Sequence, residues 1–335
     1  MKAYVLHKTD IVENKPLKNE EYPDPVLKDD ELLVRIAASG VCHSNLHTIE
    51  GDWKPIGIPA KLPIIPGHEI VGFVEEVGKG VKKFSKGQRA GIQPLWNTCG
   101  YCEYCLSGRE HLCMTQDATG ESVDGGFAQY IKIPEAHTYA VPDNLDVVEA
   151  APLFCPGVTA YRGIRRTGLT FGQKIAIFGI GGVGHLSVQF AKLAGAEVIA
   201  VDTGEAQREL AKEFEADYVL SPGEVDSLIQ KIGRPDIVAV HTPAQKAIDQ
   251  AFQTVKRGGT ILLAVPGGQP FINAFEEYTV LGLEVGTRLD LQQVLKLAEK
   301  RKIRVKCKAY DMSEVNEVLL KLKKGEVTGR AVLTP

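Results

Sequence analysis

The fold of this chain is decided by residues 174–202, which read KIAIFGIGGVGHLSVQFAKLAGAEVIAVD. The first six of them, KIAIFG, are typical of a buried strand. In residues 183–196 apolar side chains recur near positions 183, 186, 190 and 193, which is a helical spacing. Residues 197–202, EVIAVD, predict a second strand. A strand, a glycine-rich turn, a helix and a strand in this order predict a βαβ unit with parallel strands.

The turn of this unit carries the pattern G-x-G-x-x-G, a weak motif that gains weight because a strand precedes it and a helix follows it. Its glycines allow a pyrophosphate to approach the free N–H groups of the helix N-terminus. Asp202 lies 18 residues beyond the last of these glycines. A carboxylate there binds a ribose 2′-hydroxyl and repels a 2′-phosphate, so NAD is expected rather than NADP, although Arg208 tempers this preference. The expected loop residues are Gly179, Gly181, Gly182, Val183 and Gly184.

The same alternation of strands and helices continues outward to residue 286. Each helical run is long enough to cross back over a sheet between parallel strands. Six strands joined in this way predict a doubly wound parallel sheet. Further helices are expected at 205–214, 226–233 and 247–259, and further strands at 217–220, 236–240, 260–268 and 280–286.

The residues on either side of this region have a different sequence pattern. The first 150 residues are rich in short extended runs broken by glycine and proline, such as 31–42 and 69–78, and predict a mostly β region. After Gly286 two helices are expected, at 290–300 and 314–325. Because the chain is 335 residues long, we expect two domains rather than one small core.

The composition is that of an ordinary globular protein, with 44% hydrophobic and 24% charged residues. A net charge of −3, without a basic stripe, argues against nucleic acid or an acidic membrane surface as a partner. No run of eighteen uncharged apolar residues predicts a membrane span, and MKAYVLHKTD at the N-terminus does not resemble a signal peptide. We therefore expect a soluble, cytoplasmic protein.

Four of the seven cysteines lie within CGYCEYCLSGREHLC, residues 99–113. In a reducing compartment such a cluster is more typical of a metal site than of disulfides. Iron–sulfur ferredoxins also begin C-x2-C-x2-C but continue with x3-C-P, whereas here seven residues precede the fourth cysteine. Four thiolates around one tetrahedral zinc fit better, and such a closed site is structural. Its predicted ligands are Cys99, Cys102, Cys105 and Cys113.

Eight stretches of the chain together resemble the zinc-dependent, medium-chain alcohol dehydrogenases over essentially its full length. Their combination, in this order, is highly specific. The stretches are GVCHSNLH (40–47), EGDW (50–53), PIIPGHEIVGFVEEVG (63–78), the four-cysteine lobe, DGGFAQY (124–130), CPGVTAY (155–161), GIGGVGHL (179–186) and GEVTGRAVL (325–333).

This resemblance implies an α/β protein with two domains. One is a catalytic domain containing a partly open, GroES-like β-barrel, at residues 1–151 and 287–335, which carries the structural zinc lobe at 91–115. The other is a Rossmann domain with a doubly wound parallel sheet, at residues 152–286, for NAD. The resemblance also implies a homodimer or homotetramer that acts on a small alcohol or aldehyde.

The resemblance further implies a catalytic zinc held by Cys42, His68 and Cys155, with Glu69 as an inner carboxylate. Two cysteines and one histidine leave a fourth position on zinc for water or substrate. Spacing alone does not assemble these residues, since each by itself is a weak signal. With the structural site, this makes two zinc ions per subunit.

In the implied mechanism, zinc acts as a Lewis acid that lowers the pKa of the bound alcohol, and the alkoxide passes a hydride to the nicotinamide. The proton is expected to leave through Ser44, the ribose hydroxyls of the cofactor and His47, because an ordinary histidine pKa near about 6.5 suits a shuttle. The remaining implied positions are His43 and Arg330 at the pyrophosphate, Thr159, Leu263, Ala264 and Val265 around the nicotinamide, Trp53 in the substrate pocket and Arg288 as a structural residue.

Two positions depart from the family pattern. Asn45 stands where the family usually has an aspartate that orients the zinc-bound histidine. Changes at such outer positions typically cost about 10–100-fold in metal affinity or activity, so weaker zinc binding is expected. Pro94 stands where many relatives have tryptophan, with Trp96 two residues later, so substrate preference should not be copied from relatives.

Three functions are therefore compared. The leading one is NAD-dependent oxidation of primary or simple secondary alcohols, because the short segment 48–63 with its tryptophan favours a hydrophobic pocket. The second is a polyol or amino-alcohol dehydrogenase of the same superfamily. The third is a non-catalytic, NAD-binding zinc-thiolate redox sensor, which would not need the serine and histidine of a proton relay.

Overall fold

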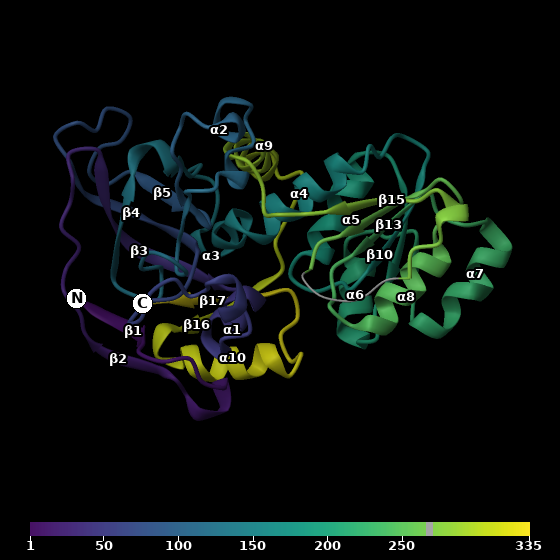
Figure 1. Cartoon of the computed structure of the whole chain (residues 1–335), viewed down its shortest axis with the longest axis horizontal. Helices are drawn as coiled ribbons and strands as arrows, with labels where there is room; N and C mark the ends of the chain where they lie inside the picture. The colour runs from purple at the N-terminus through teal and green to yellow at the C-terminus, as the bar shows by residue number, and fades with distance from the viewer. Residues whose placement is uncertain (266–270) are drawn as a thin grey trace. The chain divides into compact units, whose positions relative to one another are not determined.

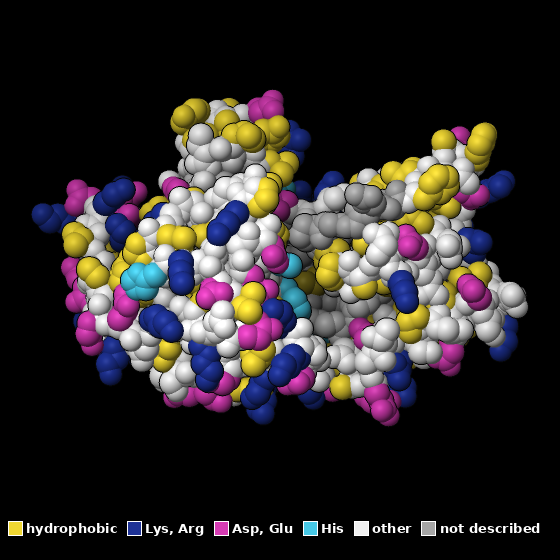
Figure 2. All heavy atoms as spheres, turned by 60° about the horizontal axis from the view of Figure 1, so that its bottom comes forward, with side chains coloured by type: hydrophobic (Ala, Val, Ile, Leu, Met, Phe, Trp, Pro, Cys, Tyr) yellow, Lys and Arg dark blue, Asp and Glu magenta, His cyan; other side chains and the backbone are white. Residues whose placement is uncertain are grey.

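The computed structural model describes residues 1–265 and 271–335, which form two compact units. The first unit comprises Met1–Cys155, Thr287–Lys300 and Val305–Pro335, and the second comprises Pro156–Gly286 and Arg301–Arg304. Figure 1 labels many of the elements of both. On the face shown in Figure 2, Lys and Arg side chains are interspersed with Asp and Glu, in keeping with the small net charge. Among the described residues, no helix is both long and apolar enough to cross a membrane.

The second unit is built on a six-stranded parallel sheet with the order β12-β11-β10-β13-β14-β15. The order reverses between β10 and β13, and ligands bind at such a switch point, beyond the carboxyl ends of the strands. The sequence prediction of a doubly wound parallel sheet is thus confirmed. The strands are β10 (Lys174–Phe178), β11 (Glu197–Val201), β12 (Tyr218–Leu220), β13 (Ile237–Val240), β14 (Thr260–Leu263) and β15 (Thr279–Gly282).

Within the described residues of the second unit, five α-helices accompany this sheet: α4 (Pro156–Arg166), α5 (Gly184–Leu193), α6 (Glu205–Glu213), α7 (Val225–Ile232) and α8 (Gln245–Thr254). Side chains alternate between the two faces of each strand. On one face, Phe178 and Val240 pack with residues of α7 and α8 in a single apolar cluster. Ile175 and Ile177 point to the other face and are fully buried, and α5 contacts β10 and β11. The continuous apolar runs read in the sequence are therefore strands covered on both faces.

Several predicted elements of this unit are shorter than expected. Helix α8 ends at Thr254 rather than 259, because Val255 is extended and residues 256–259 form a turn with Gly258 at a φ of +67°. Strand β14 ends at Leu263, whereas the predicted strand ran to 268 and so partly lies outside the described residues. The last strand, β15, begins at Thr279, one residue before its predicted start, and ends at Gly282 rather than at residue 286.

The first unit contains a seven-stranded sheet with the path β16-β17-β3-β4-β5-β9, in which β8 also pairs with β3. Two small sheets, β1-β2 and β6-β7, accompany it. The mostly β character read in the first 150 residues is thus confirmed. The strands are β1 (Lys2–Leu6), β2 (Leu17–Glu21), β3 (Glu31–Val41), β4 (Glu69–Val77), β5 (Arg89–Ile92), β6 (Leu95–Asn97), β7 (Asp117–Ala118), β8 (Tyr130–Pro134), β9 (Tyr139–Ala140), β16 (Cys307–Asp311) and β17 (Arg330–Thr334).

The α-helices of the first unit are α1 (His43–Glu50), α2 (Glu103–Leu106), α3 (Val147–Ala150), α9 (Arg288–Glu299) and α10 (Val315–Lys323). Helix α1 follows β3 directly and buries Leu46 and Ile49 in a cluster with Val315 and Leu319 of α10. This packing fixes the end of β3, where the first of the predicted zinc ligands lies. The two helices predicted after residue 286 are observed as α9 and α10.

The division between the units falls between Cys155 and Pro156, whereas the predicted boundary was between 151 and 152. A short 3-10 helix, η5 (Ala151–Phe154), belongs to the first unit because Phe154 is fully buried there against Gly91 of β5. Residues 301–304 belong to the second unit, where the backbone of Arg304 exchanges two hydrogen bonds with the Gln189 side chain at 2.8 and 2.9 Å.

Candidate metal centre and dinucleotide site

The sheet of the first unit brings four distant donors together. Gly40 of β3 pairs with Glu69 of β4, so the end of one strand meets the start of the next. Cys42 follows β3, His68 precedes β4 and Cys155 follows η5. The ligand atoms of Cys42, His68, Glu69 and Cys155 all lie within 4.8 Å of one another, and the two Sγ atoms are 3.9 Å apart. These residues, whose spacing in the sequence did not predict a common site, thus converge on one point, which we call the Cys–His–Glu centre.

Burial determines the electrostatics of this centre. His68, Glu69 and Cys155 are buried, with at most 9% of each residue exposed. The hydrogen bond between the two thiols lowers the pKa of Cys42 and raises that of Cys155, because one sulfur holds the proton for both. Burial raises the pKa of Glu69 to about 8, against the opposing effect of Arg330. A bound cation would relieve this accumulation of buried acidic groups.

Arg330 lies against Glu69 in the structure. Its Nη2 donates to Oε1 of Glu69, and 3% of the residue is exposed. The other oxygen of Glu69, Oε2, is buried without a hydrogen-bond partner among the described residues. A Cβ on residue 40 would collide with this oxygen, so Gly40 is required for the carboxylate to fit. An orphaned buried carboxylate oxygen beside two thiols and an imidazole is a donor set that suits zinc.

His68 has a partner on each ring nitrogen. The Oγ of Ser44 lies 3.3 Å from Nε2, and Nδ2 of Asn45 lies 3.5 Å from Nδ1. Oδ1 of Asn45 accepts the backbone N–H of Cys42 at 2.8 Å. The amide therefore presents an N–H donor, not an acceptor, to the histidine. Ser44 lies where a hydroxyl can reach a ligand of the centre.

His47 and Trp53, which were expected in the relay and the substrate pocket, contact each other. Their ring centroids are 4.9 Å apart with an angle of 27° between the planes, so the rings are stacked. Nδ1 of His47 also lies 2.8 Å from Oδ2 of Asp52. His43, at the start of α1, is exposed, as a cofactor contact requires. The sequence did not single out Asp52, although it lies within the EGDW stretch, next to Trp53.

The four-cysteine lobe forms a second set of donors within the first unit. The Sγ atoms of Cys99, Cys102, Cys105 and Cys113 lie within 4.8 Å of one another. Although burial opposes it, hydrogen bonds from the backbone of Cys99 and from Thr115 lower the pKa of Cys113 to about 6. The apolar side chains of the lobe are largely outside any core, since Tyr101, Leu106 and Met114 are exposed. A metal bound by the four thiolates would take the place of a core here.

The glycine-rich turn lies at the switch point of the parallel sheet. Gly179 follows β10 with a φ of +89°, which favours glycine. A Cβ on Gly184 would collide with the carbonyl oxygen of Gly179, whereas a Cβ on Gly181 would meet nothing within 4 Å. Gly179 and Gly184 thus shape the turn and its contact with α5. The open side at Gly181 leaves room for a ligand to approach the backbone.

Asp202, after β11, is held against this turn. Its Oδ2 accepts the N–H of Ile180 at 2.6 Å, and its Oδ1 accepts that of Gly204 at 2.8 Å. Each carboxylate oxygen has a second lone pair for a ribose hydroxyl. Arg208 donates from Nη1 to the carbonyl oxygens of Asp202 and Thr203 at 3.0 and 2.8 Å. The guanidinium therefore lies against the backbone of Asp202, the residue whose preference for NAD it was expected to temper.

The sequence analysis missed a histidine at the same switch point. His241 follows β13, and its Nε2 lies 2.9 Å from Oγ of Ser187 in α5. Its Cδ2 lies near the position that a Cβ on Gly184 would take. Burial lowers the pKa of His241 to about 4. The sequence signal that could have identified His241 was its position directly after the fourth strand of a doubly wound sheet.

The remaining expected cofactor residues are placed as follows. Thr159 is buried in α4, and Leu263 is the last residue of β14. Ala264 continues the sheet by donating to the carbonyl oxygen of Val240 at 3.1 Å. Val265 is the last described residue before the gap. In the first unit, Arg288 donates to Oε1 of Glu110 from its backbone and its side chain, at 2.7 and 3.2 Å, which suits the structural role expected for it.

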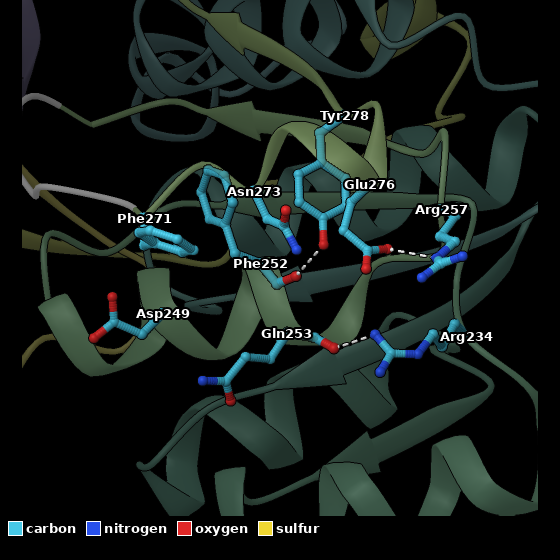
Figure 3. A pocket seen from close by; sticks show the side chains of 9 residues that line it. All are labelled: Arg234, Asp249, Phe252, Gln253, Arg257, Phe271, Asn273, Glu276 and Tyr278. Atoms are coloured by element: carbon cyan, nitrogen blue, oxygen red, sulfur yellow. Dashed lines mark hydrogen bonds and ion pairs between the residues drawn. The ribbon is translucent and has the colours of Figure 1, made fainter.

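Two open cavities are lined almost entirely by other residues. One, of about 840 Å³, belongs to the second unit and is shown in Figure 3. Its lining residues are Arg234, Asp249, Phe252, Gln253, Arg257, Phe271, Asn273, Glu276 and Tyr278. The other, of about 760 Å³, lies in the first unit between α9 and the four-cysteine lobe. Of the residues expected to bind metal, cofactor or substrate, Cys105 alone lines either of them.

Comparison with known proteins agrees with this geometry. Residues 28–143 match the family described as alcohol dehydrogenase GroES-like domain, and residues 182–300 match zinc-binding dehydrogenase. An alcohol dehydrogenase from Geobacillus stearothermophilus is 42% identical over 327 residues, covering 95% of this chain and 96% of that protein.

Solved structures show the same similarity. The crystal structure of the alcohol dehydrogenase from Aeropyrum pernix has a TM-score of 0.93 and 33% identity, covering 100% of both chains. The acetophenone reductase from Geotrichum candidum in complex with NAD has a TM-score of 0.87 and 30% identity, covering 100% of this chain and 97% of that one. The chain therefore belongs to the zinc-dependent, medium-chain alcohol dehydrogenase family.

Proposed function

We propose that this protein catalyses the reversible oxidation of primary or simple secondary alcohols to aldehydes or ketones, with hydride transfer to NAD. The observation that carries this proposal is the convergence of Cys42, His68, Glu69 and Cys155 on one buried point beside Ser44. Two thiolates and an imidazole hold zinc while leaving a position for substrate. When bound there, zinc supplies Lewis-acid chemistry that lowers the pKa of an alcohol oxygen.

Ser44 and His47 handle the proton in this proposal. The Ser44 hydroxyl, two residues after Cys42 at the start of α1, accepts the proton of the alcohol and passes its own on. His47 lies three residues further along the same helix, with about a third of its side chain exposed, so it can take up a proton and release it to solvent.

The glycine-rich turn is proposed to bind the pyrophosphate of NAD through the N–H groups at the start of α5. Asp202 selects NAD over NADP, because its carboxylate accepts a 2′-hydroxyl and repels a 2′-phosphate. An NAD complex among the structural relatives supports this assignment. The other proposed contacts are Gly179, Gly181, Gly182, Val183 and Gly184 in the turn, His43 and Arg330 at the pyrophosphate, Thr159, Leu263, Ala264 and Val265 around the nicotinamide, and Trp53 in the substrate pocket.

The four-cysteine lobe is proposed to hold a second, structural zinc, which makes two ions per chain. A set of four cysteine ligands is closed, so this ion takes no part in the reaction. The match to a zinc-binding dehydrogenase family supports zinc as the metal of the chain. All seven cysteines are free thiols in the structure, which suits metal binding in a reducing compartment such as the cytoplasm.

We also propose a homodimer or homotetramer, assembled through the second unit. Strand β15 is the edge of the parallel sheet within the described residues. Nearby, Phe271, Ile272 and Phe275 are 83%, 56% and 88% exposed, and Figure 3 shows Phe271 beside the cavity. Exposed edge strands and apolar patches are common association surfaces. Light scattering after gel filtration tests this: Phe275→Asp should shift the mass toward one chain, and a wild-type mass of one chain would refute it.

The proposed function is tested by the change in nicotinamide absorbance on mixing the protein with a panel of alcohols, with NAD and NADP in parallel. Reduction of NAD by short or aromatic alcohols, abolished by a zinc chelator, is the expected result. Ser44→Ala should stop turnover while NAD binding persists, and Ser85→Ala, at an exposed serine, is the matched control. Activity on polyols alone, or no change in absorbance with protein that holds both zinc ions, would overturn the proposal.

A further inference from the structure

The end of helix α1 places a carboxylate on the ring of His47. Gly51 adopts a φ of +82° and stops the helix, and the N–H groups of Gly51 and Asp52 both donate to the carbonyl oxygen of His47 at 3.0 Å. The chain therefore turns back over the last turn of α1. Oδ2 of Asp52 lies 2.8 Å from Nδ1 of His47 as a result.

The indole of Trp53, the next residue, holds the same ring from its face. The two ring centroids are 4.9 Å apart and the planes are 27° from parallel. A hydrogen bond at the ring edge and a stack on its face together restrict the rotation of the imidazole. Asp52, Trp53 and His47 thus form one assembly, fixed by a left-handed glycine rather than by side-chain contacts alone.

The other charged groups around α1 are engaged elsewhere or lie further along the chain. Lys323 of α10 pairs with Glu50 and Glu13 at 2.8 and 3.0 Å. His43 lies one turn earlier on α1, and Lys54 follows Trp53. Within the described part of the chain, Asp52 is the carboxylate that contacts His47. A single acidic group therefore lies at the edge of this ring.

We propose that Asp52 is a positioning residue for the proton relay: by accepting the Nδ1–H of His47, it leaves the Nε2 lone pair as the proton acceptor. This inference rests on the proposed function. When Nε2 takes up a proton, an N–H bond forms there and the Nδ1–H bond remains, so the ring becomes an imidazolium beside the Asp52 carboxylate. Release of that proton to water restores the neutral ring.

A merely structural pair has different consequences. An exposed ion pair contributes on average less than about 1 kcal/mol to stability, and its loss leaves the chemistry unchanged. The positioning role instead predicts that the charge and the acceptor at residue 52 act separately. Asp52→Asn keeps an acceptor but removes the charge, Asp52→Ala removes both, and Asp52→Glu restores both with a longer side chain.

The experiment measures the pH dependence of the rate of alcohol oxidation and, without turnover, the tautomer and titration of His47 by NMR in ¹³C-histidine-labelled full-length protein. Asp52→Ala should lower the rate several-fold across the pH range and move part of the ring population away from the Nδ1–H tautomer, because no acceptor for that proton remains. Asp52→Glu should recover most of the rate, and Asp52→Asn, which keeps an acceptor, should change the tautomer less than Asp52→Ala. An unchanged rate and an unchanged tautomer in Asp52→Ala would overturn the proposal.

A second histidine–carboxylate pair in the first unit is the matched control. Nε2 of His7 lies 2.9 Å from Glu20, far from the Cys–His–Glu centre in sequence. Glu20→Gln should leave the His47 titration and the rate unchanged. His47→Gln distinguishes a failure of the proton relay from a failure of the positioning role. If this variant leaves the rate and the pH profile unchanged, the relay itself is wrong. If it alters them and the Asp52 variants do not, the positioning role alone fails.

Discussion

The two sets of metal donors in this chain are built in opposite ways. The four-cysteine lobe takes all its donors from fifteen consecutive residues with little core around them. The Cys–His–Glu centre takes donors as far apart as Cys42 and Cys155, which are 113 residues apart, and brings them together at the adjoining ends of β3 and β4, with three of the four buried. If both sets bind zinc as proposed, the metal organises the chain in the first case and the fold organises the metal site in the second. Removing one ligand should therefore have different consequences in the two regions.

The largest effect is expected at the Cys–His–Glu centre. Cys155→Ser should lower turnover by at least about a thousandfold, because a Lewis acid contributes several kcal/mol to the transition state. Zinc content should fall from two ions per chain to one, measured by mass spectrometry alongside NAD reduction. Cys307→Ser, at a half-buried cysteine outside both metal-binding groups, is the matched control. Full turnover with one zinc lost would remove the distinction between the two regions.

At the lobe the expected loss is in stability. Cys113→Ser should lower the free energy of unfolding by roughly 3 kcal/mol, because metal binding there is coupled to folding. Urea denaturation measures this loss, and limited proteolysis should cut within residues 99–113 in the variant before it cuts elsewhere. At low temperature the folded fraction should still reduce NAD. An unchanged unfolding curve with one zinc missing would show that the lobe folds without its metal.

The same contrast explains what could be predicted from the sequence. The four cysteines and the glycine-rich turn are local patterns, and the strand–helix alternation around the turn predicted the parallel sheet of the second unit. The Cys–His–Glu centre was not a local pattern. Its donors meet because Gly40 pairs with Glu69 across β3 and β4, and such a register is a property of the folded sheet. The family resemblance, not spacing, supplied this set.

Side-chain partnerships were the least predictable layer. Arg330 contacts Glu69 and Trp53 stacks on His47, and the sequence predicted neither contact. Both residues belong to stretches that were recognised correctly. Which neighbour a long or aromatic side chain contacts depends on its rotamer and on the chain that packs over it. Sequence patterns carry no signal for either.

Asn45 offers a finer way to sharpen the comparison. A histidine that binds zinc through Nε2 carries its proton on Nδ1, where it faces the N–H donor of the Asn45 amide. Asn45→Asp supplies an acceptor for that proton while keeping one for the N–H of Cys42. Release of the centre's zinc to a chromogenic chelator should slow by about 10–100-fold. The zinc of the lobe, released in the same experiment, is the internal reference and should not change.

If the release of both zinc ions slows equally in Asn45→Asp, the effect comes from global stability and not from His68. If neither changes, the amide already satisfies the histidine, and the difference between this chain and the family pattern has no consequence for the metal. Zinc release from the lobe is therefore a control, within the same molecule, for zinc release from the Cys–His–Glu centre.

The smallest expected effect concerns acid stability beside the lobe. Nε2 of His137 lies 3.2 Å from Oγ1 of Thr98, the residue before Cys99. Burial, together with the positive charge of Arg288, lowers the pKa of His137 to about 4. The unfolded chain binds a proton at this histidine below about pH 6.5 and the native chain does not, so stability is lost as pH falls from about 6.5 to 4.

His137→Gln removes this linkage. Wild-type stability should fall by up to about 1.4 kcal/mol per pH unit more steeply than that of the variant between pH 6.5 and 4, measured by urea denaturation at each pH. Above about pH 7 the two slopes should coincide, because the histidine is then neutral in both states. A slope difference that persists there would mean that the variant acts by losing the Thr98 contact. The lobe would then depend on packing as well as on its metal, and the contrast between the two regions would be one of degree.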